Sequence, residues 1–273
     1  MTVHLNKNRL VVVLAATLSM NMAMAANPVG NAAAWDMDVH IDLIGLAQLD
    51  VGAQTSVALT NVLASASDSQ TLPSAAFASP LDLITLSTGA LASDVEYVGS
   101  NMSAIAARSS VDDLDLAIGA GVLSMGVGSV TSTSSLAGTC PEPVQQSKSL
   151  LDDFMFYSSF DAGNLGPGGG GGGNGGGFGG LPPSGTGLID PQITILGTAV
   201  PGLPLNPAPN TTIDLGGLGI VGATLILNEQ TISGDGVHSL ATATNAIHLT
   251  IDVAQLVTAD VIIAHSDVSL ACP

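Results

Sequence analysis

The stretch Trp35-Asp36-Met37-Asp38-Val39-His40-Ile41-Asp42-Leu43 decides the fold class. Apolar and polar side chains alternate along it, and successive side chains of a β-strand point to opposite faces of the sheet. The stretch therefore predicts a half-buried strand. Its apolar face consists of Met37, Val39, Ile41 and Leu43, and its polar face consists of Asp36, Asp38, His40 and Asp42.

Similar stretches recur along the chain and are separated by turn signals such as Ser233-Gly234-Asp235-Gly236. They are Thr55 to Leu63, Ile84 to Leu91, Leu114 to Val130, Ile193 to Val200, Ile220 to Leu227, Leu240 to Ile251 and Val261 to Leu270. With 46% hydrophobic residues, the chain can bury a core. The pattern predicts an all-β, antiparallel, β-sandwich-like domain. An elongated β-solenoid is the alternative, since small apolar residues and glycines suit stacked coils.

A glycine-dominated segment interrupts this pattern between Gly163 and Gly187, with Gly168 to Gly173 unbroken. Such a segment cannot bury a core, so it predicts a disordered, flexible loop. The loop divides the β domain into a first part, residues 26–162, and a second part, residues 188–273.

The N-terminus has the three parts of a secretory signal. Lys7 and Arg9 precede the apolar run Leu10 to Met20, and the small residues Ala23 to Ala25 follow. The run is shorter than the ~20 residues that a membrane-spanning helix needs. Residues 1–25 are therefore predicted to be a cleaved signal peptide, and the mature chain is expected outside the cytoplasm with no membrane span.

The mature chain would be strongly acidic. Arg108 and Lys148 are its only Lys or Arg, against 22 acidic residues, which gives a net charge of −20. This charge repels phosphate backbones and argues against nucleic-acid binding. The expected partners are further copies of the chain or components of the cell surface.

The two cysteines, Cys140 and Cys272, agree with export, because a disulfide persists in an oxidising compartment. We expect them to be bonded. Two unpaired buried thiols are the alternative, since the sequence does not show whether their Cα atoms lie within bonding range.

Acidic residues provide the candidate metal ligands. Asp36, Asp38 and Asp42 are predicted to share a strand face, and Asp112, Asp113 and Asp115 crowd a short stretch. Calcium would relieve this like-charge repulsion and binds carboxylate oxygens. Plain surface charge is the commoner explanation, since no twelve-residue calcium loop is present. We expect no other cofactor.

No motif places a catalytic nucleophile beside a base. The chain lacks a Gly-x-Ser-x-Gly elbow, a His-Glu-x-x-His pair and a P-loop. Its histidines, serines and aspartates still leave a secreted hydrolase open, because catalytic triads assemble from distant positions.

Several motifs in the second half resemble those of choice-of-anchor P family proteins, which are bacterial secreted or surface proteins. The motifs are Gly121 to Ser124, Val127 to Ser132, Ala208 to Ile213, Leu225 to Gln230, Asn245 to Leu249 and Ala259 to His265. The resemblance spans roughly Leu91 to Leu270. It implies export and an extracellular β domain of undetermined activity, with no catalytic residues to carry over.

Six residues of these motifs are site candidates: Asn210, Asn228, Glu229, Gln230, Asn245 and His248. We interpret Asn228, Glu229, Asn245 and His248 as strand-end and turn-forming groups, because such side chains satisfy backbone donors. The long glycine insertion and the ending Cys272-Pro273 depart from the family pattern, so release to the medium or retention by a partner is expected. The sequence thus favours a secreted, non-enzymatic extracellular or cell-surface structural or adhesion protein, with a matrix or fibre component as one variant. A secreted hydrolase and a calcium-dependent binding module are the alternatives.

Overall fold

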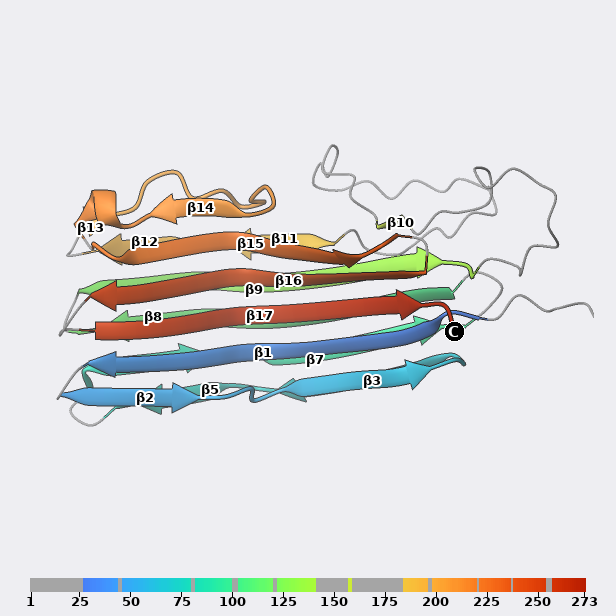
Figure 1. Cartoon of the computed structure of the whole chain (residues 1–273). Helices are drawn as coiled ribbons and strands as arrows, with labels where there is room; N and C mark the ends of the chain where they lie inside the picture. The colour runs from blue at the N-terminus through green and yellow to red at the C-terminus, as the bar shows by residue number, and fades with distance from the viewer. Residues whose placement is uncertain are drawn as a thin grey trace, which may run out of the picture.

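Two antiparallel β-sheets lie face to face in the computed structural model of the chain (Figure 1). The structure describes residues 27–43, 46–79, 82–99, 103–119, 122–140, 157–158, 184–195, 198–219, 221–236, 238–253 and 257–273. The predicted all-β, sandwich-like fold is confirmed. The β-solenoid alternative is wrong, because the paired strands run antiparallel within two facing sheets and do not form stacked coils. The predicted signal peptide lies outside the described residues.

The first sheet, sheet A, has the strand order β14-β15-β16-β17-β1-β2, and β3 also pairs with β1. Its strands are β1 Val29–Leu43, β2 Ala47–Val51, β3 Ser56–Val62, β14 Thr211–Asp214, β15 Ala223–Gly234, β16 Ser239–Val253 and β17 Val257–Ala271. A short 3-10 helix, η2 Gly216–Leu218, precedes β15.

The second sheet, sheet B, has the order β13-β12-β9-β8-β6-β5, with β7 on β8, β4 on β7, and both β10 and β11 on β9. Its strands are β4 Ala66–Leu72, β5 Ala75–Ala78, β6 Ile84–Thr88, β7 Leu91–Val98, β8 Ser103–Ile118, β9 Leu123–Gly138, β10 Tyr157–Ser158, β11 Gly185–Ile189, β12 Gln192–Ile195 and β13 Thr198–Ala199. Strands from before and after the glycine-rich segment therefore contribute to both sheets.

Two predicted boundaries are wrong. The glycine-rich loop was expected to reach Gly187, but β11 begins at Gly185 and pairs with β9 through Thr133; residues 159–183 lie outside the described part of the chain. The stretch Leu114 to Val130 is two strands rather than one. Gly119, with a φ of 59°, turns the chain between β8 and β9, and such a φ favours glycine.

The alternation of buried and exposed side chains shifts by one residue along a line that crosses sheet A. The residues on this line, which the strand pairing skips, are Asp36 in β1, Ala264 in β17, Ala246 in β16 and Asn228 in β15. Ala264 and Asn228 have positive φ angles of 55° and 53°. Pairs of consecutive residues such as Asp36 and Met37 are consequently both buried.

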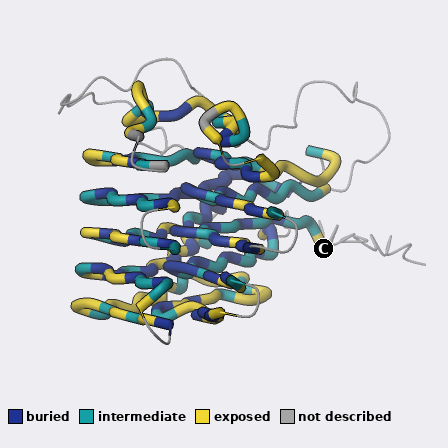
Figure 2. Tube along the Cα trace, turned by 90° about the vertical axis from the view of Figure 1, so that its left-hand side faces the viewer, coloured by how far each residue is buried: buried dark blue, intermediate teal, exposed yellow. Residues whose placement is uncertain are grey.

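This line divides the interior into two halves, each with its own apolar cluster between the sheets. Figure 2 shows buried segments in both sheets. The aliphatic half contains large side chains such as Met37, Ile41, Leu116 and Met125. The second half, which we call the hydroxyl half, contains a smaller cluster that includes three alanines, with Tyr97, Leu136 and Leu270 among its larger members.

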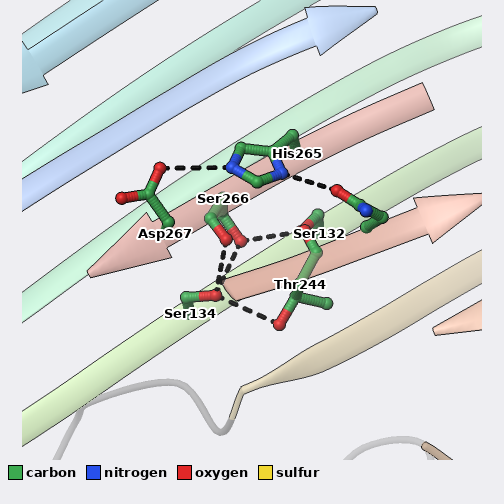
Figure 3. Close-up of polar contacts among 7 residues, drawn as sticks. Ser132, Ser134, Thr244, His265, Ser266 and Asp267 are labelled. Carbon is green, nitrogen blue, oxygen red and sulfur yellow. Dashed lines mark hydrogen bonds and ion pairs between the residues drawn. The ribbon is translucent and has the colours of Figure 1, made fainter. Parts of the chain in front are cut away.

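Hydroxyl groups join the two sheets directly beside the smaller cluster (Figure 3). Ser132 Oγ of β9 donates to the Thr244 carbonyl at 2.8 Å, and Ser134 Oγ donates to the Ser266 carbonyl at 2.8 Å. Ser132 Oγ and Ser266 Oγ are 2.7 Å apart, and Ser134 Oγ donates to Thr244 Oγ1 at 3.1 Å. All four residues are fully buried. Their small side chains let the two backbones approach closely enough for these bonds to form.

The predicted disulfide is confirmed. Cys140 and Cys272 are bonded, with their Cα atoms 5.4 Å apart, and they follow the ends of β9 and β17. The bond thus ties sheet B to sheet A at the end of the hydroxyl half. In the same half, Tyr97 Oη donates to the Pro28 carbonyl at 2.6 Å.

Candidate functional site

A network of imidazole, carboxylate and amide groups crosses the outer face of sheet A. We call it the histidine network, and it consists of Asp260, His248, Glu229, Asn245, His265 and Asp267. β15 supplies Glu229, β16 supplies Asn245 and His248, and β17 supplies the other three. The antiparallel register aligns the strands, since Glu229 is opposite Asn245 and Asn245 is opposite His265.

Glu229 lies at the centre of the network. Its Oε2 accepts a hydrogen bond from Asn245 Nδ2 at 2.7 Å and contacts His248 Nδ1 at 2.8 Å. The other ring nitrogen of His248, Nε2, lies 3.0 Å from Asp260 Oδ1. The His248 side chain is only 20% exposed, so the protein largely shields these contacts from water.

The side chain of Asn245 connects Glu229 to His265. Because Glu229 can only accept, the amide nitrogen of Asn245 faces it, and the amide oxygen is left to face His265 Nδ1. His265 Nε2 lies 3.1 Å from Asp267 Oδ1 (Figure 3). Trp35, the only tryptophan of the chain, stacks on the His265 ring with 4.5 Å between ring centroids and 16° between planes.

Each of these two rings faces an oxygen acceptor at both nitrogens. A neutral imidazole has one N–H, whereas an imidazolium has two. Both nitrogens of His248 and of His265 are therefore engaged within the network.

His40, on β1, also has a carboxylate oxygen close to each of its ring nitrogens. Its Nε2 lies 3.1 Å from Asp38 Oδ1, and its Nδ1 lies 3.0 Å from Asp50 Oδ1. A shallow hollow of about 360 Å³ lies beside it and is also lined by Asp42 and Asp260. His40 is 53% exposed, so these contacts are open to solvent.

The structure separates the first group of calcium candidates. Asp38 and Asp42 lie on the outer face of sheet A, but Asp36 does not share that face and is fully buried. The expectation of one common face is wrong, because the shift in alternation at Asp36 and Met37 turns the carboxylate inward. Burial raises the pKa of the Asp36 carboxyl, while hydrogen bonds from the backbone N–H groups of Gln54, Thr55 and Met37 lower it. Asp36 thus holds the chain between β2 and β3 against β1.

The second group lies on β8 in sheet B. Asp112 Oδ1 accepts a hydrogen bond from the Ser129 hydroxyl at 2.8 Å. Asp113 is skipped by the pairing of β8 with β9 and has a φ of 47°, and Asp115 is exposed. Within the part of the chain that the structure describes, no group of three or more His, Cys, Asp or Glu residues is placed to hold a metal ion.

The family-motif residues converge in space. Asn228 Nδ2 donates to the Pro207 carbonyl, Gln230 Nε2 donates to Asn228 Oδ1, and Asn210 Oδ1 accepts from Gln230 N. Asn228 thus satisfies a backbone carbonyl, but from within β15 rather than from a strand end. The strand-end and turn interpretation is also wrong for Glu229, Asn245 and His248, which lie within long strands and join the histidine network.

Sequence reasoning missed the other members of the network: Asp260, His265, Asp267 and the stacked Trp35. The spacing of His265 and Asp267 places both on one strand face, which was a usable signal. Their alignment with Asn245 depends on strand register, which one sequence does not show. The buried hydroxyl residues Ser132, Ser134, Thr244 and Ser266 carry no sequence signal either, because serine and threonine are common on exposed strand faces.

Ring contacts of His40, His238, His248 and His265 in the described ranges are to carboxylate or amide oxygens, and none is to a hydroxyl group. No family model and no curated protein sequence matches the chain. Among the described residues, no helix is long and apolar enough to cross a membrane.

Proposed function

We propose that this chain is an exported, non-enzymatic structural or adhesion protein that acts outside the cell, of the kind that the resemblance to choice-of-anchor P family proteins implies. The three-part leader and the Cys140–Cys272 bond support export. The acidic composition makes a nucleic-acid partner unfavourable and favours other cell-surface components or further copies of the chain.

The histidine network is the observation that carries the non-enzymatic part of the proposal. A general base needs a ring nitrogen within hydrogen-bond reach of the group that it deprotonates. His248 instead points both nitrogens at carboxylate oxygens of the two neighbouring strands. His265 points one nitrogen at Asn245 of β16 and the other at Asp267 of its own strand. The rings thus act as cross-links between β15, β16 and β17, which suits a load-bearing scaffold better than a hydrolase.

The way in which the two sheets are joined also suits a durable extracellular scaffold. Strands of 15 or 16 residues run the length of the sandwich, and the disulfide and the buried hydroxyl bonds hold the sheets together at one end. A bond between residues 132 positions apart also restricts the unfolded chain.

Export and catalysis are tested on the full-length protein and on its secreted product. We expect the protein outside the cytoplasm with Ala26 at its N-terminus, and no turnover in a screen of ester, glycoside and peptide substrates. His248→Gln and His265→Gln variants serve as matched controls. Turnover by the secreted protein that either variant abolishes would contradict the proposal in favour of a hydrolase. An intact leader on protein recovered only from the cytosol would contradict export.

A further inference from the structure

The edge strand β3 lies in an uncharged run of an otherwise acidic chain. No charged residue occurs from Val51 to Ser67, although the whole chain carries a net charge of −18. β3 itself reads Ser-Val-Ala-Leu-Thr-Asn-Val and contains neither proline nor lysine. β-Sheet proteins commonly protect their edges with charges and prolines, so this edge lacks the usual protection against pairing.

The free backbone groups of this edge follow from its hydrogen bonds. β3 pairs only with β1 among the described strands. Ser56 N does not bond to β1 but donates to Gln70 Oε1 at 2.9 Å. Since alternate residues of an antiparallel strand turn their N–H and C=O groups to the same side, Ala58 also directs its groups away from β1. A bulge at Asn61, which has a φ of 53°, ends the regular part of the edge.

Other edge strands of the described fold are less suited to pairing. β2 carries Asp50, β4 carries Asp68 and β14 carries Asp214. β5 is uncharged but has only four residues, and β13 has only two. Leu188 N of β11 is occupied by the Leu205 carbonyl. β3, with seven residues, is the longest uncharged edge strand among them.

We propose that β3 is the surface on which a second copy of this chain docks, with the two β3 strands antiparallel about a two-fold axis. The pairing brings Ala58 of the two copies opposite each other and continues sheet A from one copy into the next. Mutual repulsion between copies is weakest along an edge without charges, which is why the second copy approaches here. The inference rests on the proposed function, since it names the surface through which the extracellular protein self-associates.

Sedimentation equilibrium of the disulfide-bonded mature protein tests the proposal. We expect a monomer–dimer equilibrium. Ala58→Asp places like charges opposite each other and is expected to lower the association constant about tenfold or more. Thr212→Asp on β14 adds the same charge at the opposite edge of sheet A and serves as the matched control, with association little changed. Ala58→Pro removes only an outward N–H and should also weaken dimerisation.

Gln70→Ala provides a variant with the opposite expected effect. It frees the Ser56 N–H of each copy, so the association constant should rise, by about fivefold for each of the two symmetry-related hydrogen bonds added. Circular dichroism and the melting temperature establish that each variant is folded before its association is measured.

The outcomes separate this inference from the proposed function. Dimers that Ala58→Asp and Thr212→Asp weaken equally, or not at all, would overturn docking at β3 while leaving an extracellular scaffold role intact. A mature protein that stays monomeric up to millimolar concentration would overturn the docking inference as well. Dimers lost in Ala58→Asp but kept in Thr212→Asp would support β3 docking, even if the export and turnover tests overturned the proposed function.

Discussion

The aliphatic half and the hydroxyl half of the sandwich share the same long strands but hold their sheets together differently. The aliphatic half relies on large buried side chains such as Leu116 and Met125. The hydroxyl half buries fewer large side chains and adds hydrogen bonds between sheets and the Cys140–Cys272 bond. One strand can thus pass through two packing regimes when its inward face changes at a position that the strand pairing skips.

The difference in packing between the two halves follows from the size of their buried side chains. Burying apolar area contributes roughly 25 cal/mol per Å², so large aliphatic residues stabilise the first half strongly. Serine and alanine bury less area, but their size allows a hydroxyl to reach a carbonyl of the facing sheet. A buried hydroxyl without a partner would cost about 1–3 kcal/mol, so these bonds must be well formed.

Removing the disulfide is expected to have the largest effect. The double variant Cys140→Ala and Cys272→Ala should lose about 5 kcal/mol of unfolding free energy, because the bond restricts a loop with a sequence separation of 132 residues. Denaturant unfolding measures the loss. The rate of amide hydrogen exchange should rise first in the hydroxyl half. A uniform rise across both halves would show that the disulfide does not stabilise the hydroxyl half selectively.

Truncation in the aliphatic half is expected to have the next largest effect. Leu116 is fully buried, and Leu116→Ala should cost about 3 kcal/mol through lost burial and a new cavity. Leu46, which is 70% exposed, provides the control, and Leu46→Ala should change stability very little. Equal losses in the two variants would show that the aliphatic cluster is not the core of that half.

Asp36 lies on the line between the two halves, and its titration should make the free energy of unfolding depend on pH. Because burial raises the pKa of the folded-state carboxyl, the contribution of Asp36 is fully present below the unfolded-chain pKa near 3.8 and is lost as pH rises through the folded-state pKa. The stability of the wild-type protein minus that of Asp36→Asn should therefore increase as pH falls from neutral toward 4. Denaturant unfolding across this range measures it, and a difference that decreases on acidification would contradict the burial of the ionised group.

The histidine network should contribute least to stability, because partly exposed ion pairs are weak. His265→Gln should cost less than about 1 kcal/mol. It should nevertheless change the fluorescence of Trp35, which stacks on that ring. His238→Gln in the exposed turn is the matched control and should leave the fluorescence unchanged. An unaltered Trp35 signal in His265→Gln would contradict the stacking.

Much of the fold could be predicted from alternation alone. β1, β16 and β17 alternate clearly on either side of their irregular positions, and the hairpin at Gly234 and Gly236 has the expected turn residues. β4 was missed, because nearly all its residues are exposed and no apolar face marks it. The inward turn of Asp36 was missed because the alternation shifts where the strand pairing skips Asp36, and no distinctive residue marks that point.

The site could be predicted only in part. Glu229, Asn245 and His248 were candidates by motif, but their common network depends on the register of β15 against β16. Register arises from the pairing of whole strands, so Asp260 and Asp267 could not be assigned as partners of the histidines. The hydroxyl bonds depend on the packing of one sheet against the other, which is a further step removed from the sequence.

Direct hydrogen bonds join the two sheets in the hydroxyl half, and a double-mutant cycle on Ser132 and Ser266 is the most direct test of these bonds. The two Oγ atoms are 2.7 Å apart on facing sheets. Unfolding free energies of Ser132→Ala, Ser266→Ala and the double variant should give a coupling energy of about 1 kcal/mol. Additive losses, with no coupling between the two serines, would contradict direct hydrogen bonding between the sheets.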